Sequence, residues 1–326
     1  MSAAAGMPGR RTLDPGRAAE RLRATGIALP FAALFVTLSI ASSSFLTKVN
    51  LLNILDQQAA TLIIAAAGTL VLVAGGIDLS VGAVYSLAGV TAAELASRTS
   101  PVVAIVLGVC VGLAVGLVNG LVVTRLRINA LIATLAMSFV VSGLGTLVTH
   151  GNLVVLFEHP EFGDLARTQI FGVKTSIWIA IVAVVVIGVL LARTTAGRYM
   201  YASGGNAQAA RLAGVRVDAI RVLTFVVSGG AAGLAGVIDA SRVLSAQSGS
   251  GEALAFTVLA GIVVGGTSIL GGEGAVWRTV VGVLFIALVG NGFDLLGLDP
   301  LYEQITLGVI LLLAVAVDAW ARQRRS

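Results

Sequence analysis

Long stretches without a charged residue constrain this chain more than any other feature of its sequence. A helix that crosses about 30 Å of hydrocarbon needs about 20 largely apolar residues. The third, ninth and tenth stretches are short, so we expect them to borrow flanking residues, tilt, or be sheltered by protein. The ten candidate spans are Ala24–Thr47, Gln57–Ile77, Leu79–Ala93, Thr99–Thr124, Ile128–Phe157, Thr175–Ala192, Val222–Ile238, Ala253–Gly272, Thr279–Phe293 and Gln304–Val317.

Composition excludes an ordinary soluble enzyme. Of the 326 residues, 57% are hydrophobic and 11% are charged, against about 25% charged in a typical soluble domain. The mean hydropathy is +0.99, and so much apolar surface cannot be hidden in one aqueous core. The single cysteine, Cys110, excludes an intramolecular disulfide. We therefore expect an all-α polytopic membrane bundle of about ten helices.

The positive charges fix the direction of the spans. With ten spans and a cytoplasmic N-terminus, 16 of the 21 Lys and Arg residues lie inside, as the positive-inside rule requires. The five outside are Lys48, Arg98, Arg167, Lys174 and Arg242. We expect cytoplasmic tails over 1–25 and 321–326, a single transmembrane domain over 26–320, an external loop over 149–174, and a cytoplasmic loop with an amphipathic helix over 193–221.

Two glycine-rich segments interrupt the apolar sequence. One runs from Gly75-Gly76 through Asp78 to Gly82, and the other starts at Gly265-Gly266 and continues through Gly271-Gly272. Such glycines permit unwinding or close backbone approach, and tight helix packing explains them equally well. The turn Gly75–Asp78 carries no Lys or Arg, so charge leaves open whether it reaches the cytoplasm or belongs to a discontinuous helix inside the membrane.

The sequence offers little that could carry catalysis. The only histidines, His150 and His159, fall in the external loop without a metal-binding motif and are interpreted as solvated. No GxxxxGK[ST] motif is present, so we expect no ATP hydrolysis by this chain. We also expect no bound cofactor and no metal. Energy for any transport then comes from a partner or from an ion gradient.

Four aspartates lie near the ends of the uncharged stretches. Capping and snorkelling are favoured over ion coupling as explanations for them. Asp78 before Leu79 and Asp299 before Pro300 are candidate helix N-caps. Asn119 and Asn129 are interpreted as caps or as interhelical hydrogen-bonding groups. The four are Asp56, Asp78, Asp239 and Asp294.

Four motifs together resemble the membrane permease subunits of bacterial ABC importers for ribose and related monosaccharides, the branched binding-protein-dependent permease family. The resemblance covers roughly residues 27 to 318. Asn129-Ala130-Leu131 departs from it, because prolines often stand there in the family. The motifs are Ala74-Gly75-Gly76-Ile77-Asp78-Leu79-Ser80-Val81-Gly82; Gly116-Leu117-Val118-Asn119-Gly120 leading to Ile132-Ala133-Thr134-Leu135; Gly197-Arg198-Tyr199 through Gly204-Gly205-Asn206 to Ala209-Ala210-Arg211-Leu212-Ala213-Gly214-Val215; and Gly265-Gly266-Thr267-Ser268 with Gly271-Gly272-Glu273-Gly274.

This resemblance implies a homodimeric inner-membrane permease that works by alternating access. It implies a separate sugar-type ATPase inside, which uses the ATP, and a sugar-binding protein outside. The loop Arg198–Val215 would contain the coupling helix, with Gly197, Arg198, Gly204, Gly205, Asn206, Ala209, Arg211 and Gly214 as coupling residues. Candidate path or gate residues are Gly75, Gly76, Asp78, Ser80, Asn119, Thr134, Gly265 and Gly266. The substrate stays open among sugars, polyols, nucleosides and sugar-like autoinducers, with an ion-coupled transporter as the rival class.

Overall fold

The computed structural model describes residues 27–323, with side chains described up to residue 316. Its regular secondary structure is helical apart from four two-residue strands, which confirms the predicted all-α class. The expected tail over 1–25 and the terminal arginines lie outside the described side chains. The elements are α2 (Ala28–Ala41), α3 (Lys48–Val73), α4 (Val81–Ala96), α5 (Pro101–Arg125), α6 (Ala130–Thr149), β1 (Val154–Val155), η1 (Pro160–Gly163), α7 (Asp164–Arg167), β2 (Gln169–Ile170), β3 (Val173–Lys174), α8 (Thr175–Arg193), α9 (Thr195–Gly205), α10 (Ala207–Leu212), α11 (Val217–Val243), β4 (Ser245–Ala246), α12 (Glu252–Val264), α13 (Val276–Leu296) and α14 (Pro300–Gln323).

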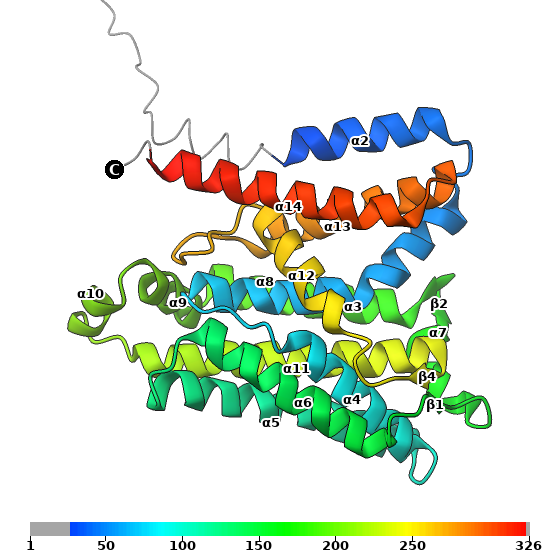
Figure 1. Ribbon diagram of the computed structural model, residues 1–326, viewed down its shortest axis with the longest axis horizontal. Helices are drawn as coiled ribbons and strands as arrows, with labels where there is room; N and C mark the ends of the chain where they lie inside the picture. Colours follow the sequence, from blue (N-terminus) through cyan, green and yellow to red (C-terminus); the bar gives the residue numbers. More distant parts are fainter. Residues whose placement is uncertain (1–26, 324–326) are drawn as a thin grey trace, which may run out of the picture.

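The long helices run roughly along one direction (Figure 1). Helices α9 and α10 lie at one end of this bundle, here called the α10 end, and the strands lie at the other, the β end. Six helices of the described part are long and apolar enough to cross a membrane, namely α3, α5, α6, α8, α11 and α13. Shorter apolar helices cover Ala28–Ala41, Val81–Ala96, Glu252–Val264 and Pro300–Ala316. This is a polytopic membrane protein.

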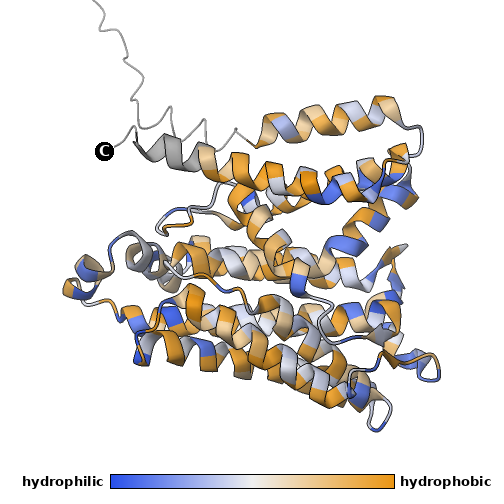
Figure 2. Ribbon diagram, viewed as in Figure 1, coloured by the Kyte–Doolittle hydropathy of each residue, from blue (hydrophilic) through white to orange (hydrophobic). Residues whose placement is uncertain are grey.

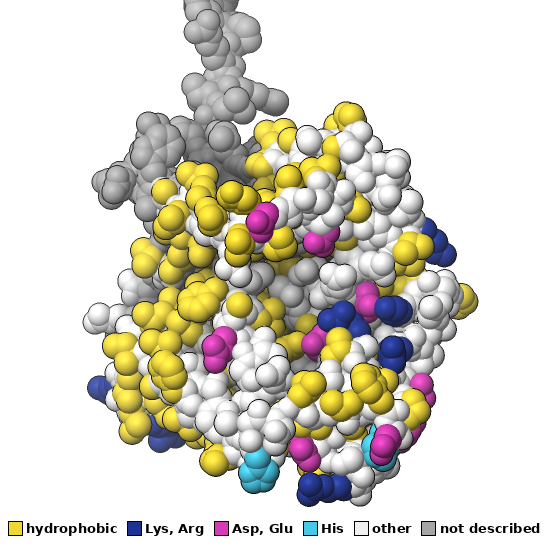
Figure 3. All heavy atoms as spheres, turned by 45° about the vertical axis from the view of Figure 1, so that its right-hand side comes forward, with side chains coloured by type: hydrophobic (Ala, Val, Ile, Leu, Met, Phe, Trp, Pro, Cys, Tyr) yellow, Lys and Arg dark blue, Asp and Glu magenta, His cyan; other side chains and the backbone are white. Residues whose placement is uncertain are grey.

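The outer helices turn apolar side chains away from the protein. Only 22% of the apolar window of α5 is buried, and the same holds for α6. Phe139 and Leu147 of α6 are 74% and 71% exposed. Orange segments run along the helices in Figure 2, whereas charged side chains gather on the β end in Figure 3. Lipid is the solvent that suits such a surface.

Helix α3 forms the centre of the bundle. Every residue from Ala59 to Ala74 is buried, and α3 packs against α8, α11, α12 and α13. Small residues also let α5 and α11 approach closely: a side-chain carbon on Gly112 would overlap the carbonyl oxygen of Gly229. Without a hydrophobic force between helices in lipid, such close packing supplies the association energy.

The third predicted span begins later, and the eighth ends earlier, than expected. The third was expected from Leu79, but α4 starts at Val81, because residues 76–79 have no regular secondary structure and Ser80 lies in a turn. The eighth was expected from Ala253 to Gly272, but α12 ends at Val264 and the chain then turns through positive φ at Gly266 and Gly271. An irregular segment over 247–251 also precedes α12. Both segments appear in Figure 1 as thin ribbon joining a short helix inside the bundle.

The expected external loop over 149–174 is folded onto the β end. Strand β1 pairs with β4, and β2 pairs with β3, both antiparallel. Ser241 of α11 ties the loop down, since its hydroxyl donates to the carbonyl of Phe162 and accepts from the amide of Ala166. Phe162 is fully buried. The loop is therefore a cap on the bundle.

Candidate functional site

Three glycine motifs that are far apart in the sequence meet at the α10 end. The amide of Gly272 donates to the carbonyl of Val73 at 2.9 Å, where α3 ends. A side-chain carbon on Gly204 of α9 would overlap that same carbonyl oxygen, and one on Gly271 would lie 2.9 Å from Cα of Gly75. Gly75 has φ +79°, which favours glycine. These backbones cross with no room for side chains.

From Gly75 onward the chain runs back into the bundle beside α11. Arg221 Nε donates to the carbonyl of Ala74 at 3.4 Å, whereas Ser228 Oγ donates to Asp78 Oδ2 at 2.8 Å. Arg221 and Ser228 are seven residues apart on one helix, so Asp78 lies about 10 Å deeper than Ala74. The turn therefore lies at the α10 end, and the non-helical stretch after it runs into the bundle.

Asp78 holds in place the non-helical stretch before α4, residues 76–80. Its Oδ1 accepts from the amide of Ser80 at 3.0 Å and from the hydroxyl of Ser80 at 2.6 Å. Ser80 occupies the N-cap position of α4 without a side-chain cap hydrogen bond, and Asp78 accepts from the amide of Ser80, one residue before the first helical residue. The carboxylate instead joins α4 to Ser228 of α11. No sequence pattern marked Ser228, which lies among glycines and valines.

Thr134 and Asn119 complete the contacts of this stretch. The Thr134 hydroxyl accepts from the amide of Leu79 at 3.1 Å and lies 3.3 Å from the carbonyl of Ile77. Asn119 Nδ2 donates to Ser80 Oγ at 2.8 Å, as expected for an interhelical group. Its Oδ1 is buried without a partner. Five predicted path residues, Gly75, Asp78, Ser80, Asn119 and Thr134, thus belong to one connected structure.

The second broken span meets the first inside the bundle. A side-chain carbon on Gly82 would overlap the carbonyl oxygen of Gly251, and the reverse also holds. The amide of Gly251 donates to Ser86 Oγ at 2.8 Å. The segment before α12 is bonded to α6, because Ser248 Oγ donates to the carbonyl of Ser142 at 3.2 Å. Helices α4 and α12 therefore begin side by side and run in opposite directions.

The remaining candidate gate residues lie at the α10 end. Gly265 ends α12, and a side-chain carbon there would lie 2.5 Å from the carbonyl of Arg278. Gly266 has φ +81°. Gly76 packs on the ring of Phe225. Gly265 and Gly266 are separated from Asp78 by the glycine crossing, so they lie outside its hydrogen-bonded network.

The predicted coupling loop consists of two short helices, each with a side-chain cap. Thr194 Oγ1 accepts from the amide of Gly197 at 3.1 Å, and Asn206 Oδ1 accepts from the amide of Ala209 at 2.9 Å. Gly197 packs against the carbonyl of Leu191, and Gly214 ends the loop with φ +85°. Arg198 donates within α9 to Thr195.

Gly205 is an open position in this loop. A Cβ atom added there would meet nothing within 4 Å among the described residues. Tyr201 donates its hydroxyl to the carbonyl of Gly274 at 2.7 Å, which fixes α9 to the segment before α13. Arg211 of α10 pairs with Asp218 of α11 at 2.8 Å.

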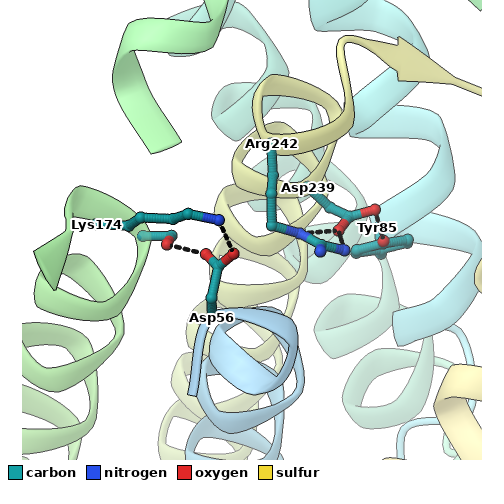
Figure 4. Close-up of polar contacts among 6 residues, drawn as sticks. Asp56, Tyr85, Lys174, Asp239 and Arg242 are labelled. Carbon is teal, nitrogen blue, oxygen red and sulfur yellow. Dashed lines mark hydrogen bonds and ion pairs between the residues drawn. The ribbon is translucent and has the colours of Figure 1, made fainter. Parts of the chain in front are cut away.

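Two of the predicted end-of-helix aspartates form partly buried ion pairs near the β end (Figure 4). Asp56 Oδ2 accepts from Lys174 Nζ at 2.6 Å, and Asp239 pairs with Arg242. Tyr85 also donates to Asp239 Oδ2 at 2.6 Å. These contacts tie α3 to the start of α8, and α11 to α4. Ion pairing, rather than helix capping, is thus the contact that the structure shows for both aspartates.

Other predictions have plainer outcomes. Asp294 is exposed. Asp299 Oδ1 accepts from the amide of Leu301, as a capping residue does, and Asn129 does the same for Leu131. No group of three metal-ligating side chains occurs within the described residues.

Broken helices that meet inside an apolar bundle define the class of this chain as a membrane transport protein. Residues 50–315 match the family described as branched-chain amino acid transport system / permease component. The chain belongs to this family. It is a permease component, and not an enzyme.

Curated relatives cover nearly the whole chain. The ribose import permease protein RbsC of Bacillus subtilis is 40% identical over 294 residues, which is 89% of this chain and 91% of the relative. RbsC of Escherichia coli K12 is 37% identical, with 88% and 91% covered. The L-arabinose ABC transporter permease protein AraH of Azospirillum brasilense is 39% identical, with 94% and 90% covered. No solved structure matches the chain.

Proposed function

We propose that this chain is the permease subunit of an ATP-binding-cassette importer that carries a monosaccharide, a pentose such as ribose or L-arabinose, across the bacterial inner membrane. The relatives named above support the substrate class. The meeting of two half-helices at Gly82 and Gly251 is the observation that carries the mechanism, because helix N-termini and unwound backbone inside a bundle are where transporters bind and release polar solutes.

Hydroxyl groups surround this meeting point. The hydroxyl oxygens of Ser86 and Ser250 lie 3.3 Å apart, and those of Thr146 and Ser248 lie 3.1 Å apart. Ser250 and Thr146 are exposed. Hydroxyls both donate and accept hydrogen bonds, which suits an uncharged polyhydroxylated solute. A polyol or a nucleoside fits the same chemistry, and substrate selection would fall to the binding protein outside.

The α10 end is the cytoplasmic side in this proposal, with ten spans and both termini inside. There α9 and α10 would dock a separate ATPase, which uses the ATP, while a binding protein would dock at the β end. A second copy of the chain would complete the permease. Since Gly204 packs against the end of α3 beside Gly75, movement of α9 would move the turn that leads to Asp78. Opening and closing of the path would follow from this contact.

Reconstitution tests the proposed function directly. Proteoliposomes with this chain, its candidate ATPase and its binding protein should take up labelled ribose or L-arabinose only with ATP on the ATPase side. A variant of the ATPase that binds but does not hydrolyse ATP is the control. Uptake that ignored ATP and followed a proton or sodium gradient would replace the importer by an ion-coupled transporter.

Gly205 gives a sharp test of docking. Because its side-chain position faces open space, Gly205→Trp leaves the fold intact and obstructs a partner at the α9–α10 junction. Co-purification of the ATPase should be lost, and Asn206→Trp should act in the same direction. Gly308→Trp, also at an open position but on α14, should retain it. Full assembly with Gly205→Trp would refute the coupling role of this loop.

A further inference from the structure

A cavity of about 690 Å³ lies at the α10 end, outside the hydrogen-bonded network of Asp78. Its volume is in the range of small-molecule sites. It lies between the end of α5, the start of α6 and the start of α11. Its charged lining residues are Arg127, Arg211, Arg221 and Asp218, and Gly75 and Gly76 form part of its wall.

The cavity has a strong excess of positive charge. Arg211 is paired with Asp218 at 2.8 Å. Arg221 donates to a backbone carbonyl, that of Ala74. Arg127 has no acidic partner in the part of the chain that the structure describes. Among the described residues, Arg127 and Arg221 therefore form no ion pair, and Asp218 is the single carboxylate among three guanidinium groups in the lining.

The start of α6 strengthens this field. Asn129 is its N-cap and, like Ala130, lines the cavity, so the positive end of a 20-residue helix faces the same space. Positive-inside topology accounts for arginines at this end of the bundle. The positive-inside rule does not explain why three arginines from three separate segments line the same cavity.

We propose that this cavity binds a phosphate-bearing anion, either a small phosphate monoester or the headgroup of an anionic lipid. Arginine forks bind phosphate oxygens through paired hydrogen bonds. Arg127, between α5 and α6, and Arg211 of α10 would provide these bonds.

The position of the cavity gives the anion a consequence for transport. Arg221 contacts Ala74, and its Nη2 lies beside Gly75. An anion that holds Arg221 would also hold the turn before Asp78 and so slow uptake. This consequence rests on the proposed function, whereas binding of the anion does not.

Titration of glycerol 3-phosphate tests the site, because this probe has a phosphate monoester and no sugar ring. The full chain in nanodiscs of phosphatidylcholine should bind it saturably, and glycerol should not bind. Arg127→Gln and Arg211→Gln should each weaken binding at least tenfold, and Arg127→Lys should weaken it less. Arg193→Gln is the matched control, since Arg193 is exposed on the same end but does not line the cavity.

A lipid arm distinguishes the two sources of phosphate. In nanodiscs that also contain phosphatidylglycerol, native mass spectrometry should detect retained lipid that the same two variants lose if the headgroup is the occupant. Absence of both glycerol 3-phosphate binding and variant-sensitive lipid retention would overturn the proposal. Equal weakening by Arg193→Gln would overturn it too. Neither readout depends on sugar uptake, so failure of the proposed function is seen separately.

Discussion

Gly82 of α4 and Gly251 before α12 touch backbone to backbone where the two half-helices begin. Each glycine excludes a side chain because the carbonyl oxygen of the other occupies the place of a Cβ atom. The contact lets two helix N-termini lie side by side inside the bundle, and it makes the spacing of both broken spans depend on two residues that are far apart in the sequence.

Replacing Gly82 by alanine should destabilise the protein. The added methyl group must push the Gly251 segment away, and overpacking of this kind costs about 1–3 kcal/mol. Thermal unfolding in detergent, followed by size-exclusion chromatography, measures the loss. Gly143→Ala in α6 is the control, because nothing lies within 4 Å of that position and alanine favours a helix. Equal melting temperatures for the two variants would contradict the packing described here.

Thr134→Val should increase local opening of the non-helical stretch before α4, residues 76–80. Valine has the shape of threonine but cannot accept the hydrogen bond from the Leu79 amide, and an unsatisfied buried amide costs about 1–3 kcal/mol. Hydrogen exchange of a peptide covering residues 75–85 should therefore speed up by at least about fivefold. Thr37→Val, whose hydroxyl bonds only within its own exposed helix, should leave that peptide unchanged.

Lys174→Met should destabilise the protein more than Asp56→Asn. Removing the lysine leaves the buried Asp56 carboxylate, 6% exposed, without its cation, whereas Lys174 is 37% exposed and keeps water as a partner. Breaking a buried ion pair costs about 3–5 kcal/mol. Because Lys174 is partly exposed, we expect Lys174→Met to lower the free energy of unfolding by about 2 kcal/mol. Arg98→Met, in an exposed pair with Glu94, should change thermal stability little. The reverse order of the Lys174 and Asp56 variants would show that Asp56 is not held as a charged group.

Tyr201→Phe should lower stability by about 1 kcal/mol, because it removes one hydrogen bond to Gly274. Burial raises the pKa of the Tyr201 hydroxyl above its ordinary value, with Arg278 opposing the rise. A raised pKa keeps the donor proton at all lower pH values, and the bond is lost only as pH rises through that pKa. The difference between wild type and variant should therefore stay constant from about pH 6 to pH 9. Melting curves across this range measure it.

Sequence patterns predicted the helices better than the site. Uncharged stretches located α3, α5, α8 and α11, because a helix that crosses lipid needs a continuous apolar surface. The broken spans were harder to predict, because a non-helical stretch between helices has the same apolar composition as the helices. Glycines are its only mark in the sequence. Asp78, Asn119 and Thr134 were selected through their motifs, and the structure brings them together, but their contacts depend on how three separate elements pack.

The polar partners of these residues carried weaker signals. A serine such as Ser228 is common on the small-residue face of a membrane helix, so nothing marked it as the partner of Asp78. The pairing of Asp56 with Lys174 joins residues 118 positions apart, and charge counts alone assigned the lysine only to a side of the membrane. A serine or threonine repeat at helical spacing along α6, from Thr134 through Ser142 to Thr146, was the one readable signal for the hydroxyl-lined region.

The central position of α3 has a consequence for synthesis. Its buried surface is covered by α11, α12 and α13, yet the ribosome makes 170 residues between the end of α3 at residue 73 and the end of α11 at residue 243. At about 5–20 residues per second this takes about 10–30 s. During that time α3, which has the lowest mean hydropathy of the six long spans at 1.4, sits in the bilayer or beside the insertion machinery without its final neighbours. The helix on which the finished bundle is centred is therefore the least apolar of the six long spans, and its burial is complete only after α11, α12 and α13 have been made.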